Sequence, residues 1–312
     1  MHSFGIIGAE NRRNVMERAL IDKIASICEI KENYRLSKIS SFKIGGEADI
    51  VALTSSINQM SELVKFAESR KLRYRLIGNA SNVLFSDEGF KGIIIKTSKM
   101  NKIYFRSNEI LVEAGVPVTK LAMEVCKFSL SGLEFAYGIP GSLGGAVYMN
   151  AGAFGGEFSS VINYVNVLIP RKGIVTIEKK KCDFAYRESW FQHNNCIILS
   201  ASISLSKGNK AEIENKMNNY MFERMEKQPL EKPSAGSAFK RPKTGYAGKY
   251  IEDAGLKGLT VGGAKVSEKH AGFIINDNSA TSKDVMELSE KVIEIVKEKF
   301  DVELKREFEF IE

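Results

Sequence analysis

The sequence predicts an α+β fold divided into two or three subdomains. Its 312 residues, of which 44% are hydrophobic, exceed the usual size of one domain. Short β-rich runs broken by glycines occupy residues 41–206, and helical patterns interrupt them at irregular intervals. Because strands and helices do not alternate regularly, this class is favoured over a doubly wound parallel sheet.

The strands of the first two thirds are predicted from β-branched runs bounded by glycines and turn residues. Two helices interrupt them, one over 56–70 with Ser56 as its N-cap and one over 118–130 ended by Ser131 and Gly132. Both carry apolar residues at helical spacing and are expected to face the core. The predicted strands are 50–53, 75–77, 92–96, 110–113, 161–169, 173–177 and 196–205.

The last third begins after a charged helix predicted over 211–227. Pro229 and Pro233 mark a boundary there, because proline stops a helix. Beyond it we expect a strand at 272–276 and a helix opened by Thr281, with Asp284 at capping-box spacing. The alternating run 303–311 predicts a last strand. Alternation with a period of two places four charged residues on one face of this strand, and these residue types by themselves are typical of a solvated surface. They are Glu303, Lys305, Glu307 and Glu309.

Charge and composition exclude several classes of protein. The net charge of +7 would suit a nucleic-acid binder if it were clustered, but the longest basic run, Lys179–Lys181, is flanked by Glu178 and Asp183. We therefore expect no nucleic-acid partner, whereas a mildly basic surface suits small anionic substrates. No apolar run approaches the ~20 residues of a membrane span, and the first residues lack a signal-peptide pattern, so a cytoplasmic protein without a membrane partner is expected.

Cysteine and histidine spacing supports neither a disulfide framework nor a metal site. The cysteines show no C-x-x-C pair, and the histidines are His2, His193 and His270. We expect no metal ion and ordinary buried thiols at Cys28, Cys126, Cys182 and Cys196.

Glycine is strongly clustered, although no two glycines stand at i and i+2, so a dinucleotide fingerprint is absent, and no P-loop is present. Seven of the 26 glycines fall within 138–156. Such turns expose backbone N–H groups that hold phosphate oxygens. The run GNASN at 78–82, after the strand RLI, has the same character. Either run alone is equally well explained as a tight β-turn, but together they favour a nucleotide cofactor.

Six motifs, in order, resemble the UDP-N-acetylenolpyruvoylglucosamine reductase family. The resemblance covers roughly residues 34–311, and GIPGSLGG alone would indicate only the wider FAD-binding group that includes vanillyl-alcohol oxidase. The motifs are SSFKIGGEAD (40–49), LIGNASNVLFSDEGFKGIIIK (76–96), GLEFAYGIPGSLGGAVYMNAGAFGGE (132–157), FAYRES (184–189), KQPLEKPSAGSAFKRP (227–242) and GGAKVSEKHAGFIIN (262–276).

The resemblance implies a two-part FAD-binding region of the vanillyl-alcohol-oxidase type, formed by subdomains at 17–100 and 101–226. A C-terminal α+β substrate domain at 227–312 follows, with its last strand returning to the active site, and residues 1–16 form a tail without assigned function. The implied activity is that of an oxidoreductase acting on a CH–CH bond with NADP as acceptor, in peptidoglycan precursor synthesis. NADPH reduces the flavin, and UDP-N-acetylglucosamine enolpyruvate then enters the same site and is reduced to UDP-N-acetylmuramate. We expect a monomer.

The resemblance also implies residue roles for the cofactor. FAD is expected to be non-covalently bound, since no histidine lies in a flavin motif. Two departures stand out. Ala80 replaces a glycine, so we expect either a negative φ there or room for a methyl group, and Phe154 replaces a tyrosine, which removes one substrate hydrogen bond. The implied FAD-binding residues are Gly78, Asn79, Ser81, Asn82, Gly138, Ile139, Pro140, Gly141, Ser142, Gly144, Gly145 and Gly152.

Three catalytic roles are carried over in the same way. Arg187 is implied to stabilise the enolate, Ser237 to donate the proton that goes to carbon, and Glu307 to share the enolate charge as a protonated carboxyl group. Without the resemblance these residues read as a surface arginine, a turn serine and part of a solvated strand. The implied substrate-binding residues are Lys227, Lys240, Arg241 and His270, of which His270 is equally well explained as a packed histidine.

Two alternatives remain. An FAD oxidase that passes electrons from an alcohol to oxygen would share the glycine-rich motifs, but SAGSAFKRP and the terminal glutamate argue against it. A basic nucleic-acid-binding protein lacks a supporting motif. One branch of the family inserts a tyrosine-bearing loop between the arginine and serine motifs. Here a strand and one helix fill that interval, so the chain resembles the shorter branch.

Overall fold

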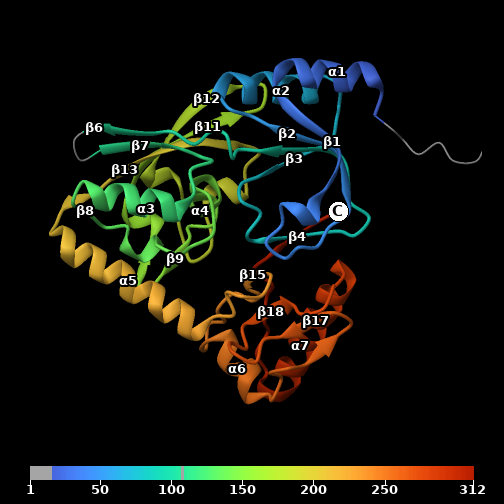
Figure 1. Ribbon diagram of the computed structural model, residues 1–312, viewed down its shortest axis with the longest axis vertical. Coiled ribbons are helices and arrows are strands. Elements are labelled where there is room, and N and C mark those ends of the chain that lie inside the picture. Colours follow the sequence, from blue (N-terminus) through green and yellow to red (C-terminus); the bar gives the residue numbers. More distant parts are fainter. Residues whose placement is uncertain (1–15, 107–108) are drawn as a thin grey trace, which may run out of the picture.

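The computed structural model describes residues 16–106 and 109–312. Except for Met16, the tail expected at 1–16 lies outside these residues. The described residues form three regions. Each has a sheet of four or five strands at its centre, and α-helices cover these sheets (Figure 1). The helices are α1 (Arg18–Ile27), α2 (Ile57–Ser69), α3 (Val118–Lys127), α4 (Leu143–Tyr148), α5 (Lys210–Lys227), α6 (Ala247–Asp253) and α7 (Ser282–Phe300).

The first sheet carries α1 and α2 on one of its faces. Ile50 and Ala52 of one strand and Ile93 and Ile95 of another face these helices, as the period of two requires. The opposite face packs Val51 and Ile94 into a separate cluster. The outer pair of strands is antiparallel and the other two pairs are parallel, in the order β1 (Glu29–Arg35), β2 (Glu47–Leu53), β5 (Phe90–Lys96) and β3 (Tyr74–Ile77).

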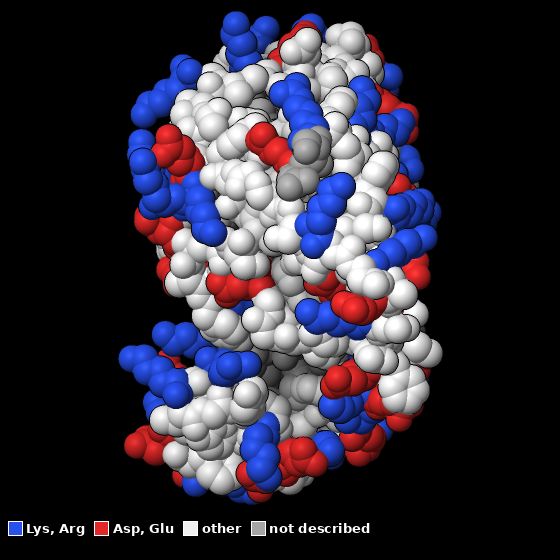
Figure 2. All heavy atoms as spheres, turned by 90° about the vertical axis from the view of Figure 1, so that its left-hand side faces the viewer, with Lys and Arg blue, Asp and Glu red and all other residues white. Residues whose placement is uncertain are grey.

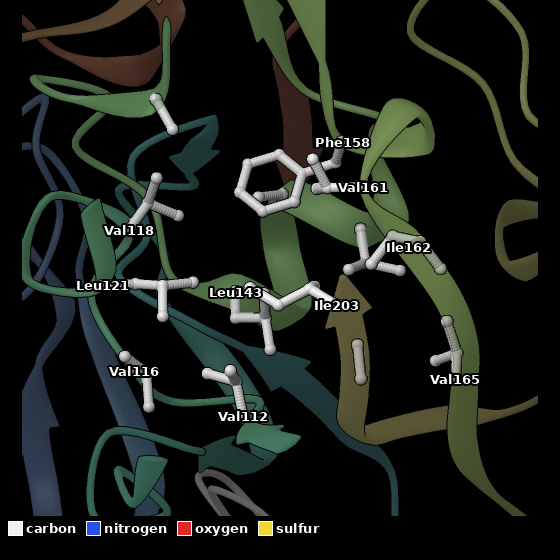
Figure 3. Close-up of a cluster of buried hydrophobic side chains, with 14 of the residues drawn as sticks. Val112, Val116, Val118, Leu121, Leu143, Phe158, Val161, Ile162, Val165 and Ile203 are labelled. Carbon is white, nitrogen blue, oxygen red and sulfur yellow. The ribbon is translucent and has the colours of Figure 1, made fainter. Parts of the chain in front are cut away.

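The second sheet is antiparallel and packs against α3 and α4. Its apolar residues form the large cluster in Figure 3, where Leu121 of α3 and Leu143 of α4 face Val112, Val165 and Ile203 of the strands. Burial of this surface is what holds the helices on the sheet. The strand order is β12 (Gly173–Glu178), β11 (Ile162–Ile169), β13 (Ile197–Ser204), β7 (Glu109–Glu113) and β6 (Ile103–Arg106).

Helix α5 leads from the second sheet to the C-terminal region, which lies at the bottom of Figure 1. A third antiparallel sheet packs there against α6 and α7, and Phe42, Ile44 and Leu84 from the N-terminal part join its core. Its strand order is β15 (Ser234–Ser237), β18 (Phe273–Asn276), β17 (Ala264–Val266) and β16 (Thr260–Val261). The expected subdomain limits at 100 and 226 stay predictions.

Short strand pairs complete the fold. The most consequential joins the C-terminal β19 (Glu309–Ile311) in parallel to β4 (Val83–Phe85), directly after the GNASN loop. The other pairs are β8 (Leu130–Ser131) with β14 (Ser206–Lys207) and β9 (Gly152–Ala153) with β10 (Gly156–Glu157).

The prediction of a last strand over 303–311 is wrong for most of that range. Only Glu309–Ile311 forms a strand, because side chains fix the preceding residues: Leu304 and Phe308 are buried, and Arg306 donates to Ser289 Oγ at 2.6 Å. The expected common face of Glu303, Lys305, Glu307 and Glu309 therefore does not exist. Glu303 and Lys305 are exposed, whereas Glu307 is turned inward against Arg187.

The other predicted elements correspond to observed ones, and the α+β class is confirmed. Ser56 caps α2 by accepting from Gln59 N, and Thr281 and Asp284 form the expected capping box of α7. Cys28, Cys126 and Cys182 are buried free thiols, and Cys196 is half-buried. In the described part of the chain, no helix is long and apolar enough to cross a membrane.

Candidate active site

A cleft of about 2070 Å³ opens between the FAD-motif loops and the C-terminal region. Figure 2 shows the molecule indented between its larger upper part and its smaller lower part, with basic and acidic side chains interspersed over the face in view. The cleft is lined by every residue that the sequence predicts for cofactor, catalysis or substrate. The role of each stays a prediction, but the fold does bring these distant motifs to one cavity.

Two loops meet at one end of this cleft, where three pairs of their residues lie close together. Asn79 Nδ2 donates to the Pro140 carbonyl at 3.1 Å. A Cβ on Gly141 would lie 3.7 Å from Ser81 Oγ, and one on Gly78 would lie only 2.1 Å from Ser142 Oγ. A side chain at position 78 would therefore require the Ser142 hydroxyl to move. The segments 78–82 and 138–145, which we call the cradle, form a single concave surface.

Ser142 has an unusual place in this cradle. It occupies the N-cap position of α4, yet its hydroxyl caps no N–H group, and its buried Oγ has no hydrogen-bond partner in the described structure. Buried hydroxyls are normally satisfied, so an orphan here indicates a missing polar ligand. The N–H groups of Leu143 and Gly144 are not available to it, because they donate to the carbonyls of Val116 and Ala114 at 2.8 Å each.

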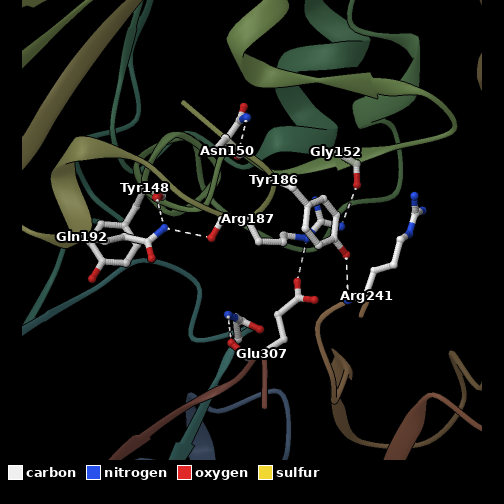
Figure 4. A network of polar contacts seen from close by, with 10 residues as sticks. Tyr148, Asn150, Gly152, Tyr186, Arg187, Gln192, Arg241 and Glu307 are labelled. Atoms are coloured by element: carbon white, nitrogen blue, oxygen red, sulfur yellow. Dashed lines mark hydrogen bonds and ion pairs between the residues drawn. The ribbon is translucent and has the colours of Figure 1, made fainter. Parts of the chain in front are cut away.

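A tight turn directs Arg187 into the cleft. Ala185 and Glu188 exchange backbone hydrogen bonds across it, and Arg187 between them has a left-handed φ of 55°. Its Nε donates to Glu307 Oε1 at 2.7 Å, and its Nη2 donates to the Gly152 carbonyl at 3.0 Å (Figure 4). The guanidinium is therefore bound on one edge and presents its remaining donors to the cavity.

Glu307 reaches this position from the C-terminal end of the chain. Its N–H donates to the Ala238 carbonyl at 2.9 Å, and its own carbonyl accepts from Asn82 Nδ2 at 3.1 Å. The side chain is only 12% exposed. Burial raises the pKa of Glu307 above its usual range, while the charges of Arg187 and Lys240 and the Arg187 hydrogen bond oppose that rise. The carboxyl group consequently holds a proton to higher pH than an exposed glutamate does.

Ser237 ends strand β15 beside these groups, since Glu307 binds the backbone of the very next residue. Its Oγ lies 3.3 Å from where a Cβ on Gly272 would be, and the His270 ring borders the same position at 3.0 Å. His270 packs edge-on against Phe273 and accepts from Gly272 N at 3.1 Å. Burial lowers the pKa of His270, which favours the neutral ring.

The predicted substrate-binding cations lie on the cleft wall in different settings. The Arg241 guanidinium lies over the Tyr246 ring at 4.4 Å and over the Tyr186 ring at 5.6 Å. The backbone N–H of Arg241 donates to the Tyr186 hydroxyl at 3.3 Å (Figure 4). Lys227 forms an ion pair with Glu223 at the end of α5, at 2.9 Å. Lys240 lies near enough to Glu307 for its charge to lower the pKa of that carboxyl group.

Sequence reasoning missed Arg224, which also lines the cleft. The side chain is buried, and its Nε has no hydrogen-bond partner in the described structure. Burial and the nearby charge of Arg187 lower its pKa. A signal was present: Arg224 shares helical spacing with the buried Ile213 and Met217, so α5 turns it inward. A buried guanidinium beside Gly138, whose Nε has no partner among the described residues, suits an anionic or carbonyl-bearing ligand.

Comparison with known proteins shows the family of this chain. Residues 228–311 match the family described as UDP-N-acetylenolpyruvoylglucosamine reductase, C-terminal domain, and residues 48–178 match the FAD binding domain. A curated UDP-N-acetylenolpyruvoylglucosamine reductase from Caldanaerobacter subterraneus is 44% identical over 301 residues, covering 95% of this chain and 99% of that protein. The chain belongs to the UDP-N-acetylenolpyruvoylglucosamine reductase family.

Further members of the reductase family agree with this assignment. The Lactiplantibacillus plantarum protein of the same name is 44% identical over 91% of this chain and 94% of its own length. The crystal structure of the reductase from Thermus caldophilus superimposes with a TM-score of 0.77 at 30% identity, covering 91% of this chain and 99% of that one. The expected fold, an FAD-binding region ahead of a C-terminal α+β domain, is confirmed.

FAD fits the residues that this member of the reductase family presents. The cradle offers an orphaned serine hydroxyl, glycines that keep a Cβ out of the loop junction, and the amide side chains of Asn79 and Asn82. These are groups that bind diphosphate and flavin oxygens. No group of three or more potential metal ligands occurs within residues 16–106 and 109–312.

The two departures from the family pattern have structural answers. Of the two alternatives expected at Ala80, the structure shows the second: φ is +51° and not negative, and the methyl group is accommodated in the buried cluster with Ile77 and Phe85. Phe154 stacks on Tyr220 of α5 at 4.2 Å, with the rings 2° from parallel, and Arg224 lies 5.2 Å from its centre. A phenyl ring suffices for this stacking.

Proposed function

We propose that this protein is the NADPH-dependent flavoenzyme that reduces UDP-N-acetylglucosamine enolpyruvate to UDP-N-acetylmuramate. The observation that carries the proposal is the meeting of Arg187, Glu307 and the Ser237 segment at the cradle, although these residues are far apart in the sequence. An FAD oxidase would need the cradle but not this constellation.

The cradle holds the cofactor in this proposal. Asn79, Ser81, Asn82 and Ser142 bind its polar groups, and Gly78, Gly141 and Gly144 let it approach the backbone. When bound, FAD supplies the hydride that reaches the terminal carbon of the enolpyruvyl group, and NADPH replenishes it. The buried Arg224 provides a fixed positive charge next to the cradle, beside Gly138.

Arg187 and Glu307 stabilise the charge that develops when the terminal carbon of the enolpyruvyl group is reduced. That charge spreads over the neighbouring carbon and the carboxylate oxygens, where guanidinium donors and a protonated carboxyl group can both bind it. The 2.7 Å contact between the two side chains fixes their orientation before substrate arrives. Such pre-organisation avoids reorganisation during the reaction.

Ser237 completes the reaction by donating its hydroxyl proton to the neighbouring carbon. A hydroxyl is a weak acid, but a carbanion-like carbon is a strong base, so a positioned serine suffices. The serine recovers its proton from solvent. The product then carries one added hydride and one added proton, which balances the reduction.

NADPH and the sugar nucleotide use the same opening in turn. The cleft volume of about 2070 Å³ is roughly twice the upper end for a single small-molecule pocket, so it accommodates a second ligand beside the flavin. Lys227, Lys240, Arg241 and His270 line it on the substrate side and suit phosphate or carboxylate oxygens. One chain supplies all of these groups, so the proposed site needs no residue from a partner subunit.

Purified protein tests the proposal directly. It should be yellow, release free FAD on acid treatment, and consume NADPH under anaerobic conditions when the enolpyruvyl sugar nucleotide is added. A flavin that is reduced by an alcohol and reoxidised only by oxygen would establish the oxidase instead. A protein that takes up no added FAD would refute both readings.

A further inference from the structure

Lys96 is a half-buried lysine beneath the cradle that the proposed mechanism leaves unused. It is the last residue of β5 and pairs with Leu53 of β2 and Ile77 of β3, at the carboxyl end of three parallel strands. Ligands of parallel sheets bind at this edge. Lys96 itself does not line the cleft, so any effect on a ligand must pass through a neighbour.

The contact that Lys96 makes is with the first residue of the cradle. Its Nζ donates to the Gly78 carbonyl at 3.1 Å. Among the described residues it forms no ion pair with a carboxylate, and the charge acting on it is that of Lys31, which repels it. Burial and this repulsion lower the pKa of Lys96. An ammonium group in such a place is a cost to the folded chain unless something else compensates it.

We infer that Lys96 is a positioning residue for the diphosphate of FAD. Its ammonium group holds the Gly78 carbonyl, which points the Gly78–Asn82 backbone toward the second loop, and its charge lies under the loop that would meet the phosphates. A hydrogen bond from a charged donor is stronger than one from a neutral donor, and a cation behind the loop favours an anionic ligand in front of it.

The geometry of the junction makes this carbonyl important. Gly78 is the residue at which an added Cβ would lie 2.1 Å from the orphaned Ser142 hydroxyl, so the two loops come close together here. Asn79, the next residue, bridges to Pro140. Fixing the Gly78 carbonyl therefore fixes the loop separation that the diphosphate must match. This inference rests on FAD being the cofactor of the proposed function.

Three variants test the inference, with FAD affinity measured by flavin fluorescence on dilution of the holoenzyme. Lys96→Met removes charge and donor but keeps an unbranched side chain, and we expect it to weaken FAD binding about tenfold or more. Lys96→Arg keeps both and should bind FAD within a few-fold of the wild type. Lys91→Met is the matched control, since Lys91 is an exposed lysine on the same strand, paired with Asp49, and should leave FAD affinity unchanged.

Thermal unfolding of the deflavinated full-length chain separates positioning from a merely structural role. Because Lys96→Met removes an unpaired, half-buried charge, the melting temperature of the deflavinated variant should equal or exceed that of the wild type while FAD binding falls. A variant that loses both stability and affinity, with Lys96→Arg equally impaired, would overturn the inference. So would an unchanged FAD affinity in Lys96→Met. A wild-type chain that binds no FAD would instead contradict the proposed function itself.

Discussion

Arg187 adopts a left-handed backbone conformation, which residues other than glycine rarely adopt. Its left-handed φ costs roughly 1–2 kcal/mol for a residue with a Cβ, and the surrounding hydrogen bonds must offset this. Gln192 Nε2 supplies part of the compensation by bridging the carbonyls of Arg187 and Tyr148, at 3.1 and 2.8 Å. The strain is retained at the point where the guanidinium meets Glu307. Local strain of this kind is typical of functional sites.

The role of Ser237 gives the sharpest prediction at this scale. Ser237→Ala should leave reduction of the flavin by NADPH near its normal rate, because hydride delivery to the cofactor uses no serine. Reoxidation by the enolpyruvyl sugar nucleotide should slow by about 10²–10⁴-fold, as expected for loss of a positioned general acid. Anaerobic stopped-flow absorbance follows the two steps separately.

A matched control is Ser204→Ala, which removes an exposed serine that accepts from Asn163; neither residue lines the cleft. It should change neither step. If Ser237→Ala slows both steps equally, the serine supports only the fold or the cofactor. If it slows neither, the proton has another source.

The pH dependence of the second step should report on Glu307. Burial raises the pKa of Glu307, so the carboxyl group stays protonated above the 4.5 of an ordinary glutamate and loses its proton as pH rises further. Reoxidation of the flavin by substrate should therefore fall with rising pH through that raised pKa. Glu307→Gln cannot ionise and should lack this decline, although its plateau rate is lower. A wild-type and variant profile of identical shape would assign the decline to another group.

Residue types and their motifs could be predicted from the sequence, but their contacts could not. FAYRES, SAGSAFKRP and the terminal glutamate are visible as patterns. That Glu307 bonds to Arg187, 120 residues away, depends on how three sheets are packed. The inward position of Arg224 could have been predicted from the periodicity of α5. Lys96 was not, because a lysine ending an apolar strand reads as a solvated boundary residue.

At the level of elements, local chemistry decided which predictions succeeded. Helices α2 and α7 were predictable because their capping residues satisfy N–H groups within the same turn. Helix α4 was missed because its glycines suggest turns, and it is held by the backbone bonds of Leu143 and Gly144 to the distant Val116 and Ala114. The long terminal strand failed because alternation alone cannot show that Leu304 and Phe308 bury themselves at a spacing of four.

Strand β19 should couple stability to activity. Ile311 pairs with Phe85 and is 5% exposed, so Ile311→Ala should cost about 2–4 kcal/mol of unfolding free energy by loss of buried surface and a cavity. Because β19 begins only two residues after Glu307, turnover should fall as well. Urea unfolding and a steady-state assay measure the two effects, with the exposed terminal Glu312→Ala as control. Unchanged stability would show that β19 is not anchored through this side chain.

Across the whole molecule, the cleft lies where separately packed cores approach one another. A ligand bound there contacts residues of several cores and stabilises all of them. FAD at 100 times its dissociation constant should add about 2.7 kcal/mol, which raises the melting temperature by several degrees relative to deflavinated protein. Circular dichroism melts with and without added FAD measure this shift. Melting temperatures that do not respond to FAD would show that the folded chain does not bind the cofactor.

The pairing of β19 with β4 also has a kinetic meaning. Asn82 and Glu307 are 225 residues apart in sequence, so their contact closes one of the longest loops that the chain allows. Closing a loop of that length costs on the order of 5 kcal/mol of chain entropy, which is recovered only after the intervening sheets have collapsed. We expect this contact to form late, on the native side of the folding barrier. Substitutions in β19 such as Ile311→Ala should then accelerate unfolding while leaving the refolding rate nearly unchanged.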